Sequence, residues 1–575
     1  MALNASLIWE VRQAGSANNG GAFRHNPFQA APSAPTVTGS GSGGTVAAGT
    51  YYCVITYTPG VRGETQISPQ QSVTLSGTTS SFTVTHPTDP GNGATWNLYV
   101  ATVSGGPYFP QGTALAIGSD RVVTTTPPTT GTQPPGVDKT LSTSPAVAID
   151  NSTITTSITT NVITFTAGYT PTGADVGNVV HMLTGTNVTA GWYEITGITS
   201  TTWTVDRNVV TSGTTTNATG NMGGATDHPA TICNIANNDN TIFVKYSATA
   251  YTFSSAGQNV SGGTVHTNGT GLYVIGYDTT RTVNNTDANR PIFKPVNNAL
   301  LMCYFNATQN IYNLDFVNPT PQTGITGIQL GANCLVRNCR FNAMNQIAIQ
   351  TGGGCTVMDC EFISCGSTQV TLLLVSASNA VRCIAKACST AGSSQTVFLA
   401  NSGVGTSFID CISYGATGNG NAFNGGGTVQ GCIAYGSGSG VNAHGFLTGS
   451  ATQYDRCVAY GNSGYGFRCT GANNYTILTR CFAGNNTVAN FDTSRYGPDQ
   501  FVGCGTLSGD PFTNAAGYDF STNTTAGAGA LLRGLTVGFP GGTTTSHPDA
   551  GAAQHADAPG GGAMHLAGRG GGLVA

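Results

Sequence analysis

The stretch FIDCISYGATGNG occupies residues 408–420, and three close relatives follow it: VQGCIAYGSGSG from Val429, YDRCVAYGNSGYGF from Tyr454 and LTRCFAGNN from Leu478. Aligned on its cysteine, the motif recurs at intervals of 21, 23, 28, 21, 25, 24 and 23 residues. The aligned cysteines are Cys339, Cys360, Cys383, Cys411, Cys432, Cys457, Cys481 and Cys504. A strand-rich repeat of this length, with Gly and Asn at its corners and no helical periodicity, predicts a parallel β-solenoid. Its coils would stack about 4.8 Å apart, which is the spacing between paired strands.

The side-chain alternation predicts that the cysteines point inward. Cys339 and Phe341 are apolar and two residues apart, so they share one face of a strand, whereas the charged Arg340 between them faces outward. Leu314 stands in the same frame one repeat earlier, so the slot accepts an aliphatic side chain as well as a thiol. The sequence therefore predicts an interior ladder of small hydrophobes, made of Cys339, Cys360, Cys383, Cys411, Cys432, Cys457 and Cys481.

Other uses of these cysteines fit the spacing less well. Metal sites favour pairs such as C-x₂-C, but the close pairs here, such as Cys334 and Cys339, are five residues apart, and we expect no metal and no cofactor. A catalytic cysteine needs a base, and no His recurs beside the motif. Disulfides between neighbouring coils are conceivable, but we expect free, buried thiols because the cytoplasm, the expected site of synthesis, is reducing.

An apolar stripe is expected on the outside of the same strands. It contains Ile384, Ile412, Ile433, Val458 and Phe482, and beside it runs a column of Tyr414, Tyr435 and Tyr460. Three explanations remain open: a segment of the same chain covers the stripe, subunits pack on it, or the tyrosines form a platform for sugars. We expect the aliphatic residues to form a subunit interface, and the tyrosines are the candidates for glycan binding.

The composition excludes several partners. Only 8% of the 575 residues are charged and Lys plus Arg number 20, so no basic surface is available for nucleic acid. No stretch approaches the length of apolar sequence that crosses a membrane, and the beginning of the chain lacks a secretory signal. We therefore expect a protein made in the cytoplasm that does not insert into membranes.

The chain is expected to contain five parts. Residues 1–31 form an N-terminal segment that caps the solenoid or attaches to a larger particle, and residues 32–137 alternate like a β-sandwich of the immunoglobulin or fibronectin type III kind. Pro-rich spacers flank this sandwich. Residues 138–229 form a small all-β collar unit, residues 230–510 form the solenoid, and residues 511–575 form a C-terminal extension with a Gly-rich tail.

Three stretches carry a resemblance to a known group of proteins: LIWEVRQAGSANNGGAFR from Leu7, FTAGYTPTGADVG with GWYEITG, and YDFSTNTTAGAGALLRG from Tyr518. Together with the coil pattern of Cys457–Phe467, which is similar to pectate-lyase-like repeats, they resemble bacteriophage proteins with a right-handed parallel β-helix, including tail spikes. The resemblance implies a homotrimer in the virion, made in the host cytoplasm, with other virion proteins and host surface polysaccharide as partners. It specifies the fold better than the function.

The resemblance also raises the question of catalysis. Tail spikes of this fold often cut polysaccharide with two carboxylates, which must lie about 5–9 Å apart. Asp359 and Glu361 flank one inward cysteine, and Asp410 lies two coils further on, so these three are the weak catalytic candidates. Arg340 and Arg382 are expected on neighbouring coils, so a structural ladder of charges explains the acids as well. The favoured hypothesis is a spike, fibre or other projecting appendage; the alternatives are a polysaccharide depolymerase and a cell-surface adhesin.

Overall fold

The computed structural model is an all-β structure with two short α-helices in the described residues, α1 (Pro229–Cys233) and α2 (Gly529–Leu532). It describes residues 3, 7–23, 31–59, 64–65, 67–90, 94–134, 147–150, 156–166, 168–171, 173–233, 239–253, 271–278, 288–295, 301–305, 307–318, 326–366, 370–390, 395–401, 405–425, 427–448, 452–470, 476–494 and 500–532. The predicted Gly-rich tail from residue 533 on lies outside these residues. The chain divides into two compact units: Met1–Ile232 with Asn240–Phe243, and Cys233–Asp239 with Val244–Ala575.

The first unit contains a two-sheet β-sandwich. One antiparallel sheet has the order β3 (Val37–Ser40), β6 (Ser81–Val84) and β9 (Arg121–Val123). The other has the order β5 (Gln71–Leu75), β4 (Gly49–Pro59), β7 (Ala94–Ala101) and β8 (Phe109–Ala116). Phe82 and Trp96, one from each sheet, are completely buried in a shared apolar core. The assignment to the immunoglobulin or fibronectin kind stays a prediction.

A second β-structure follows in the same unit. Its eight strands have the order β10 (Val147–Ile149), β17 (Thr219–Met222), β13 (Val179–Thr184), β14 (Gly191–Ile198), β15 (Thr202–Val205), β12 (Val162–Phe165), β11 (Thr156–Thr159) and β16 (Thr214–Thr215). Trp203 fills the centre, and its Nε1 donates to Asp175 Oδ2 at 2.8 Å, so this buried carboxylate is accounted for by structure.

The N-terminal segment packs on the chain at the point where the solenoid was predicted to begin. β1 (Ile8–Val11) pairs antiparallel with β2 (Ala22–Phe23) and lies next to β18 (Thr241–Lys245). Trp9 is completely buried, and its Nε1 donates to Asn240 Oδ1 at 2.9 Å. A role of this segment in capping the solenoid or in virion attachment stays a prediction.

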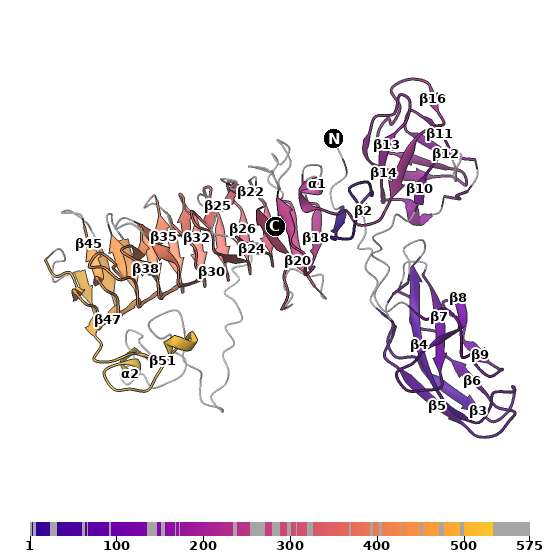
Figure 1. The fold of residues 1–575 in the computed structure, drawn as a ribbon, viewed down its shortest axis with the longest axis horizontal. Helices are drawn as coiled ribbons and strands as arrows, with labels where there is room; N and C mark the ends of the chain where they lie inside the picture. The colour runs from indigo at the N-terminus through magenta and orange to yellow at the C-terminus, as the bar shows by residue number, and fades with distance from the viewer. Residues whose placement is uncertain are drawn as a thin grey trace. The chain divides into compact units, whose positions relative to one another are not determined.

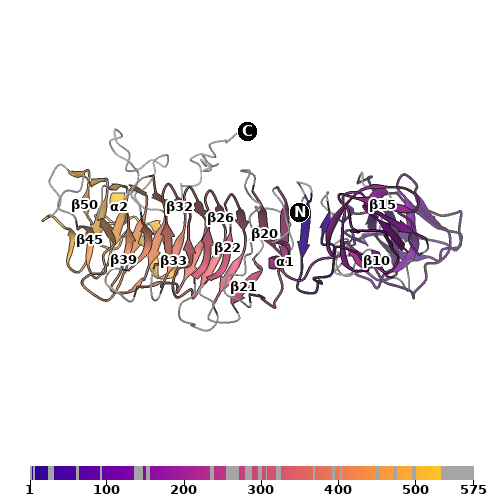
Figure 2. The same ribbon diagram turned by 90° about the horizontal axis from the view of Figure 1, so that it is seen from above.

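The second unit is the parallel β-solenoid that the repeat predicts, with its strands side by side in Figures 1 and 2. The sheet that contains β2, β1 and β18 is here called sheet 1. It continues through β20 (Tyr273–Tyr277), β23 (Asn310–Tyr312), β26 (Leu335–Arg337), β29 (Thr356–Met358), β32 (Asn379–Val381), β36 (Ser407–Ile409), β40 (Gly427–Gln430), β43 (Thr452–Asp455), β46 (Ile477–Thr479) and β49 (Phe501–Val502). Sheet 2 contains β19 (Tyr251–Phe253), β21 (Ile292–Pro295), β24 (Asp315–Val317), β27 (Arg340–Asn342), β30 (Glu361–Ile363), β33 (Ile384–Lys386), β37 (Ile412–Tyr414), β41 (Ile433–Tyr435), β44 (Val458–Tyr460), β47 (Phe482–Gly484) and β50 (Gly505–Thr506). Sheet 3 contains β22 (Leu301–Phe305), β25 (Thr326–Leu330), β28 (Ile349–Gln350), β31 (Leu372–Leu374), β35 (Thr396–Ala400), β39 (Asn421–Asn424), β42 (Phe446–Thr448), β45 (Tyr465–Cys469) and β48 (Ala489–Phe491).

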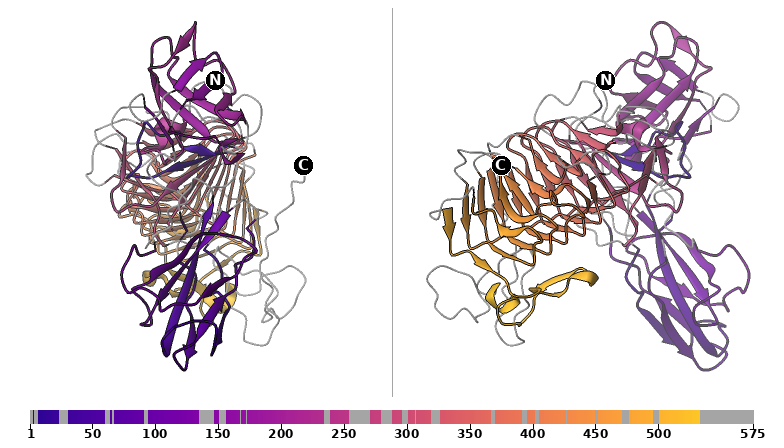
Figure 3. Two further views of the ribbon diagram at one scale, coloured as in Figure 1. Left: turned by 90° about the vertical axis from the view of Figure 1, so that its right-hand side faces the viewer. Right: turned by 60° about the vertical axis from the view of Figure 1, so that its left-hand side comes forward.

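Two minor sheets complete the described strands of this unit. β34 (Ser389–Thr390) pairs parallel with β38 (Thr417–Gly418), and β51 (Phe512–Asn514) pairs antiparallel with β52 (Asp519–Thr522). β51 and β52 belong to a segment that follows the last coil, which Figure 3 shows beside the stacked coils.

The strand register places the ladder cysteines in one frame. Arg340 pairs with Glu361, Glu361 with Ile384, and Ile384 with Ile412, so the cysteine before each of them occupies the same frame in successive coils. The seven predicted ladder cysteines are at most 2% exposed, and Leu314 is buried in the same frame. Burial raises the pKa of Cys360 and Cys432, so these thiols stay protonated.

The large side chains of the interior change sheet partway along the solenoid. In the early coils sheet 2 carries the rings, with Phe316, Phe341 and Phe362 stacked at centroid distances of 4.8 and 5.4 Å. After Phe362 the equivalent positions of sheet 2 are small, and the rings move to sheet 3. The small residues are Ala385, Ser413, Ala434, Ala459 and Ala483, and the stacked rings opposite are Phe398, Phe423, Phe446, Phe467 and Phe491. The narrow interior therefore stays filled, because one sheet contributes volume where the other gives it up.

The residue before each ladder cysteine forms the corner between sheets 1 and 2. Asp359, Arg382 and Asp410 have φ of +54°, +50° and +52°, in the left-handed region. This conformation costs a non-glycine residue about 1–2 kcal/mol, less for Asp and Asn, and it bends the chain within a single residue. The corner positions are therefore points of sharp turning, which the period-two pattern of the sequence does not reveal.

The buried ladder makes a direct prediction for thiol chemistry. The fifteen cysteines whose side chains the structure describes are free thiols, and all except Cys504 are buried. The native protein should react only slowly with a thiol reagent, whereas denatured protein should release close to the sixteen thiols of the sequence. A denatured count that rises markedly after reduction would show that disulfides are present instead.

Candidate functional site

The three acidic candidates lie along the corner between sheets 1 and 2, but they do not share one strand face. Asp359 is at the left-handed corner, whereas Glu361 lies on the outer face of β30. Arg337 Nε and Arg382 Nε lie 3.1 and 2.7 Å from the carboxylate oxygens of Asp359. Lys386 Nζ lies 2.6 Å from Glu361 Oε1. Asp359 and Glu361 therefore do not lie on one extended strand, and both belong to a ladder of alternating charges.

Asp410 differs from the other two acids. Among the described residues, no hydrogen bond or ion pair engages its carboxylate. Burial raises the pKa of Asp410, while the positive charges of Arg456 and Arg382 oppose that rise. A half-buried carboxyl group that holds its proton more tightly than usual can act as an acid, so Asp410 is the one candidate with a chemical property suited to proton transfer.

The apolar stripe is covered by the same chain. Residues 507–532, here called the C-terminal segment, pack on sheet 2 in a shared core with the stripe. Ile433 and Val458 are completely buried there, and Phe512, Phe520 and Leu532 are the main covering side chains. Figure 1 shows β51 and α2 of this segment on the side of the solenoid where β47 lies. The predicted subunit interface assumed that the stripe is open to solvent, and that assumption is wrong, because the C-terminal segment already covers these side chains. The residues concerned are Ile384, Ile412, Ile433, Val458 and Phe482.

The tyrosine column is part of the same contact. Tyr414, Tyr435 and Tyr460 stack at centroid distances of 5.6 and 5.7 Å, and Phe520 meets Tyr414 and Tyr435 edge-on. Tyr435 donates a hydrogen bond of 2.6 Å to Asp510 Oδ2. The pKa of Tyr435 is raised, mainly because the side chain is buried and also because the Asp510 carboxylate is near. The rings thus hold the C-terminal segment in place and do not form the open sugar platform that the sequence predicted.

This arrangement predicts that the same substitution destabilises the protein at a covered position of the stripe and has little effect at an exposed position. Ile433→Asp would bury a charge under the C-terminal segment and should destabilise the solenoid by several kcal/mol, since burying an isoleucine alone is worth roughly 1.5–3 kcal/mol. Ile477→Asp is the matched control, because Ile477 lies on an outer strand face and is 42% exposed. Thermal unfolding and analytical ultracentrifugation measure the two effects. If Ile433→Asp unfolds like the wild type and only changes the subunit count, the stripe is an interface after all.

A cluster of polar side chains on sheet 3 was not predicted from the sequence. His444 Nδ1 accepts a hydrogen bond of 3.0 Å from the backbone N–H of Tyr465, and its Nε2 lies 2.6 Å from Arg468 Nη1. The Arg468 guanidinium carbon is 5.5 Å from the centre of the Tyr465 ring. Alignment of HGFL (444–447) with YGFR (465–468), whose phenylalanines pair, could have revealed this cluster.

His444 should titrate far below an ordinary histidine. Burial, and then the positive charge of Arg468, lowers the pKa of His444 from 6.5 to about 4. Below about pH 6.5 the unfolded chain binds the proton that the folded chain refuses, so stability present above that pH is lost as the pH falls toward 4. We expect NMR titration of the imidazole to give this low pKa, and Arg468→Gln to raise it by removing one of the two causes. A wild-type value near 6.5, or no change in Arg468→Gln, would contradict the geometry.

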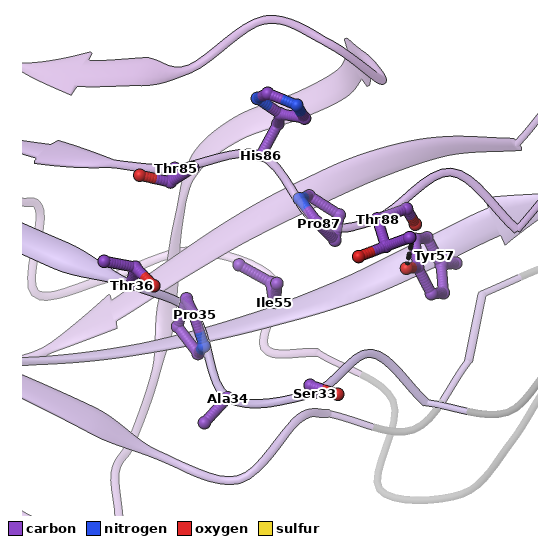
Figure 4. A pocket seen from close by; sticks show the side chains of 10 residues that line it. All are labelled: Ser33, Ala34, Pro35, Thr36, Ile55, Tyr57, Thr85, His86, Pro87 and Thr88. Carbon is purple, nitrogen blue, oxygen red and sulfur yellow. Dashed lines mark hydrogen bonds between the residues drawn. The ribbon is translucent and has the colours of Figure 1, made fainter.

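The sandwich of the first unit has a small pocket, drawn in Figure 4. It is lined by residues 33–36 and 85–88 with Ile55 and Tyr57, and its volume is about 170 Å³. Tyr57 closes one side by donating a hydrogen bond of 2.5 Å to the carbonyl oxygen of Thr88. Ligand pockets commonly enclose about 300–1,000 Å³, so this hollow is too small to be a strong candidate.

The described residues contain no group of three or more His, Cys, Asp or Glu side chains placed to hold a metal ion. Within the same part of the chain, no helix has both the length and the apolar character needed to span a membrane.

Comparisons with known proteins give likenesses of fold. No family model matches the chain, and no curated protein matches it in sequence. Among solved structures, a rhamnogalacturonan lyase is 12% identical with a TM-score of 0.26, over 46% of this chain and 70% of that one. The A-module of the Azotobacter vinelandii mannuronan C-5 epimerase AlgE4 is 10% identical with a TM-score of 0.26, over 46% and 82%. The tailspike gp49 of Acinetobacter baumannii bacteriophage Fri1, a capsular polysaccharide depolymerase, is 11% identical with a TM-score of 0.23, over 46% and 57%.

Proposed function

We propose that this protein is a virion-associated appendage of the tail-spike or tail-fibre type, which contacts polysaccharide on the host surface through the outer face of sheet 1. The resemblance of its sequence to phage β-helix proteins supports the proposed place in the virion. The homotrimer that the resemblance implies would use a face other than the covered stripe of sheet 2.

The observation that carries the proposal is a column of short polar side chains on sheet 1. Its members follow one another in register on successive strands, and each is partly or fully exposed. They are Thr356, Asn379, Ser407, Thr428 and Gln453. Such a column repeats donors and acceptors at the coil spacing of about 4.8 Å. A polysaccharide repeats hydroxyl groups along an extended chain, so the two patterns suit each other.

The chemistry of this column suits recognition of the hydroxyl groups of sugars. Hydroxyl and amide groups both donate and accept, as sugar hydroxyls do. Ser407 Oγ already donates a hydrogen bond of 2.6 Å to Asn379 Oδ1, which orients both side chains along the solenoid. Apart from Gln453 the side chains are short, so little conformational entropy is lost when a ligand orders them.

A second candidate function is depolymerisation at the neighbouring corner, and Asp410 favours it. Its raised pKa suits a general acid, and Asp359 lies two coils away, at a distance of about 10 Å from the coil spacing. That is close to the upper end of the separation of about 6.5–9.5 Å between the two acids of inverting glycosidases. Arg382 lies between these acids in the column and forms an ion pair with Asp359.

Binding to whole cells and to extracted surface polysaccharide tests the first function. Labelled protein should bind some members of a panel of bacterial strains and their purified capsule or lipopolysaccharide. The double variant Asn379→Ala/Thr428→Ala should bind about tenfold more weakly, since each lost hydrogen bond is worth roughly 0.5–1.5 kcal/mol. Gln350→Ala, on the outer face of sheet 3, is the matched control and should bind like the wild type. Absence of binding to every strain and polysaccharide would overturn the proposal.

The same samples test catalysis. If the protein releases new reducing ends from a polysaccharide that it binds, Asp410→Asn should lower the rate by about 100-fold or more, as expected for loss of a general acid. Glu361→Gln, which lies on sheet 2 and is paired with Lys386, should retain the rate. Binding without any release of reducing ends would leave attachment as the function and remove the second candidate.

A further inference from the structure

We infer that His444, Arg468 and Tyr465 form a binding site for the carboxylate of an acidic sugar. The inference rests on the proposed function and names a class of polysaccharide for it, namely polymers that contain uronic acids. His444 stands two residues before β42 and is 2% exposed, whereas Tyr465 and Arg468 of β45 are partly exposed, so the site opens through these two side chains and is separate from the polar column of sheet 1.

The hydrogen bonds around His444 leave two donors facing each other. The backbone N–H of Tyr465 can only donate, so Nδ1 of His444 must be the unprotonated acceptor of that bond. A neutral imidazole with an unprotonated Nδ1 carries its proton on Nε2. Arg468 Nη1 also can only donate, and it lies 2.6 Å from that Nε2. A negatively charged oxygen placed between the two groups would accept a hydrogen bond from each of them. The repulsive contact would then be replaced by two charge-assisted hydrogen bonds.

The carboxylate of Asp492 acts electrostatically on His444 and opposes the fall in its pKa, but among the described residues no hydrogen bond or ion pair joins Asp492 to His444. Asp492 stands one residue beyond the paired Phe467 and Phe491, and so next to Arg468 on the adjacent coil. Among the described residues, however, no ion pair joins Asp492 to Arg468, and Asp492 Oδ1 accepts a hydrogen bond of 2.6 Å from Ser494 Oγ. The Arg468 guanidinium therefore contacts the His444 imidazole, although Asp492 occupies the adjacent position on the next coil.

The neighbouring groups point to a sugar. The ring of Tyr465 is partly exposed, lies beside both His444 and Arg468, and offers an apolar face for the ring of a saccharide. A planar guanidinium fork matches the two oxygens of a carboxylate, and phosphate offers the same oxyanion chemistry.

Calorimetric titration of the full chain with hexagalacturonate and with neutral maltohexaose tests the inference. Hexagalacturonate should bind at least about tenfold more tightly, and Arg468→Gln should remove that preference while leaving maltohexaose unchanged. Arg121→Gln removes an exposed positive charge from the sandwich and controls for net charge; it should behave like the wild type. Addition of hexagalacturonate should also shift the imidazole nitrogen resonances of His444, which reports on the site when affinities are weak.

The outcomes separate this inference from the proposed function. Equal affinity for the two hexasaccharides, or an unchanged preference in Arg468→Gln, would overturn the carboxylate site even if the protein binds cells. Inorganic phosphate that displaces hexagalacturonate at equal concentration would overturn the assignment to a sugar carboxylate. Failure to bind any cell or polysaccharide would overturn the proposed function, whereas a shift of His444 on addition of hexagalacturonate would still support the site.

Discussion

The coils of the solenoid are joined by backbone hydrogen bonds in a fixed parallel register, and the other features follow from that constraint. A residue's neighbours along the axis are the residues in the same frame of the coils before and after it. Each frame must therefore hold side chains that tolerate near-identical neighbours about 4.8 Å away. Cysteines, phenylalanines and alternating charges all meet this requirement, and a slip of one residue would turn the inner set outward.

The sequence was enough to predict features that repeat. The inward direction of Cys339 and the identity of its stacking partners followed from a regular interval and a period of two, and the structure agrees. The ladder of charges was expected from Arg340 and Arg382; in the structure Arg382 does flank Asp359, but Arg337 takes the other side and Arg340 pairs with Asp315. These features were accessible because every coil provides an independent reading of the same pattern.

Features that occur once were not accessible. The C-terminal segment meets the stripe only through the tertiary path of the chain, so no repeat marks Phe520 as the partner of Tyr435. The left-handed corner at Asp359 was missed because alternation along a strand assumes extended backbone. His444 escaped attention because its importance comes from Arg468 on the next coil, and a single histidine in a glycine-rich loop carries little signal by itself.

The exchange of large side chains between sheets has a consequence for how such a chain changes in evolution. A coil is a natural unit of duplication, deletion or recombination, because its edges pair with almost any other coil. Coils before the exchange, with Phe341 or Phe362 on sheet 2, and coils after it, with Phe423 or Phe446 on sheet 3, are nevertheless two incompatible kinds. A crossover within one kind would preserve the filling of the interior, whereas one that interleaves the two would place rings against rings or leave a void. The exchange therefore divides the solenoid into two blocks that can lengthen or shorten separately, and so tune its reach without changing its cross-section.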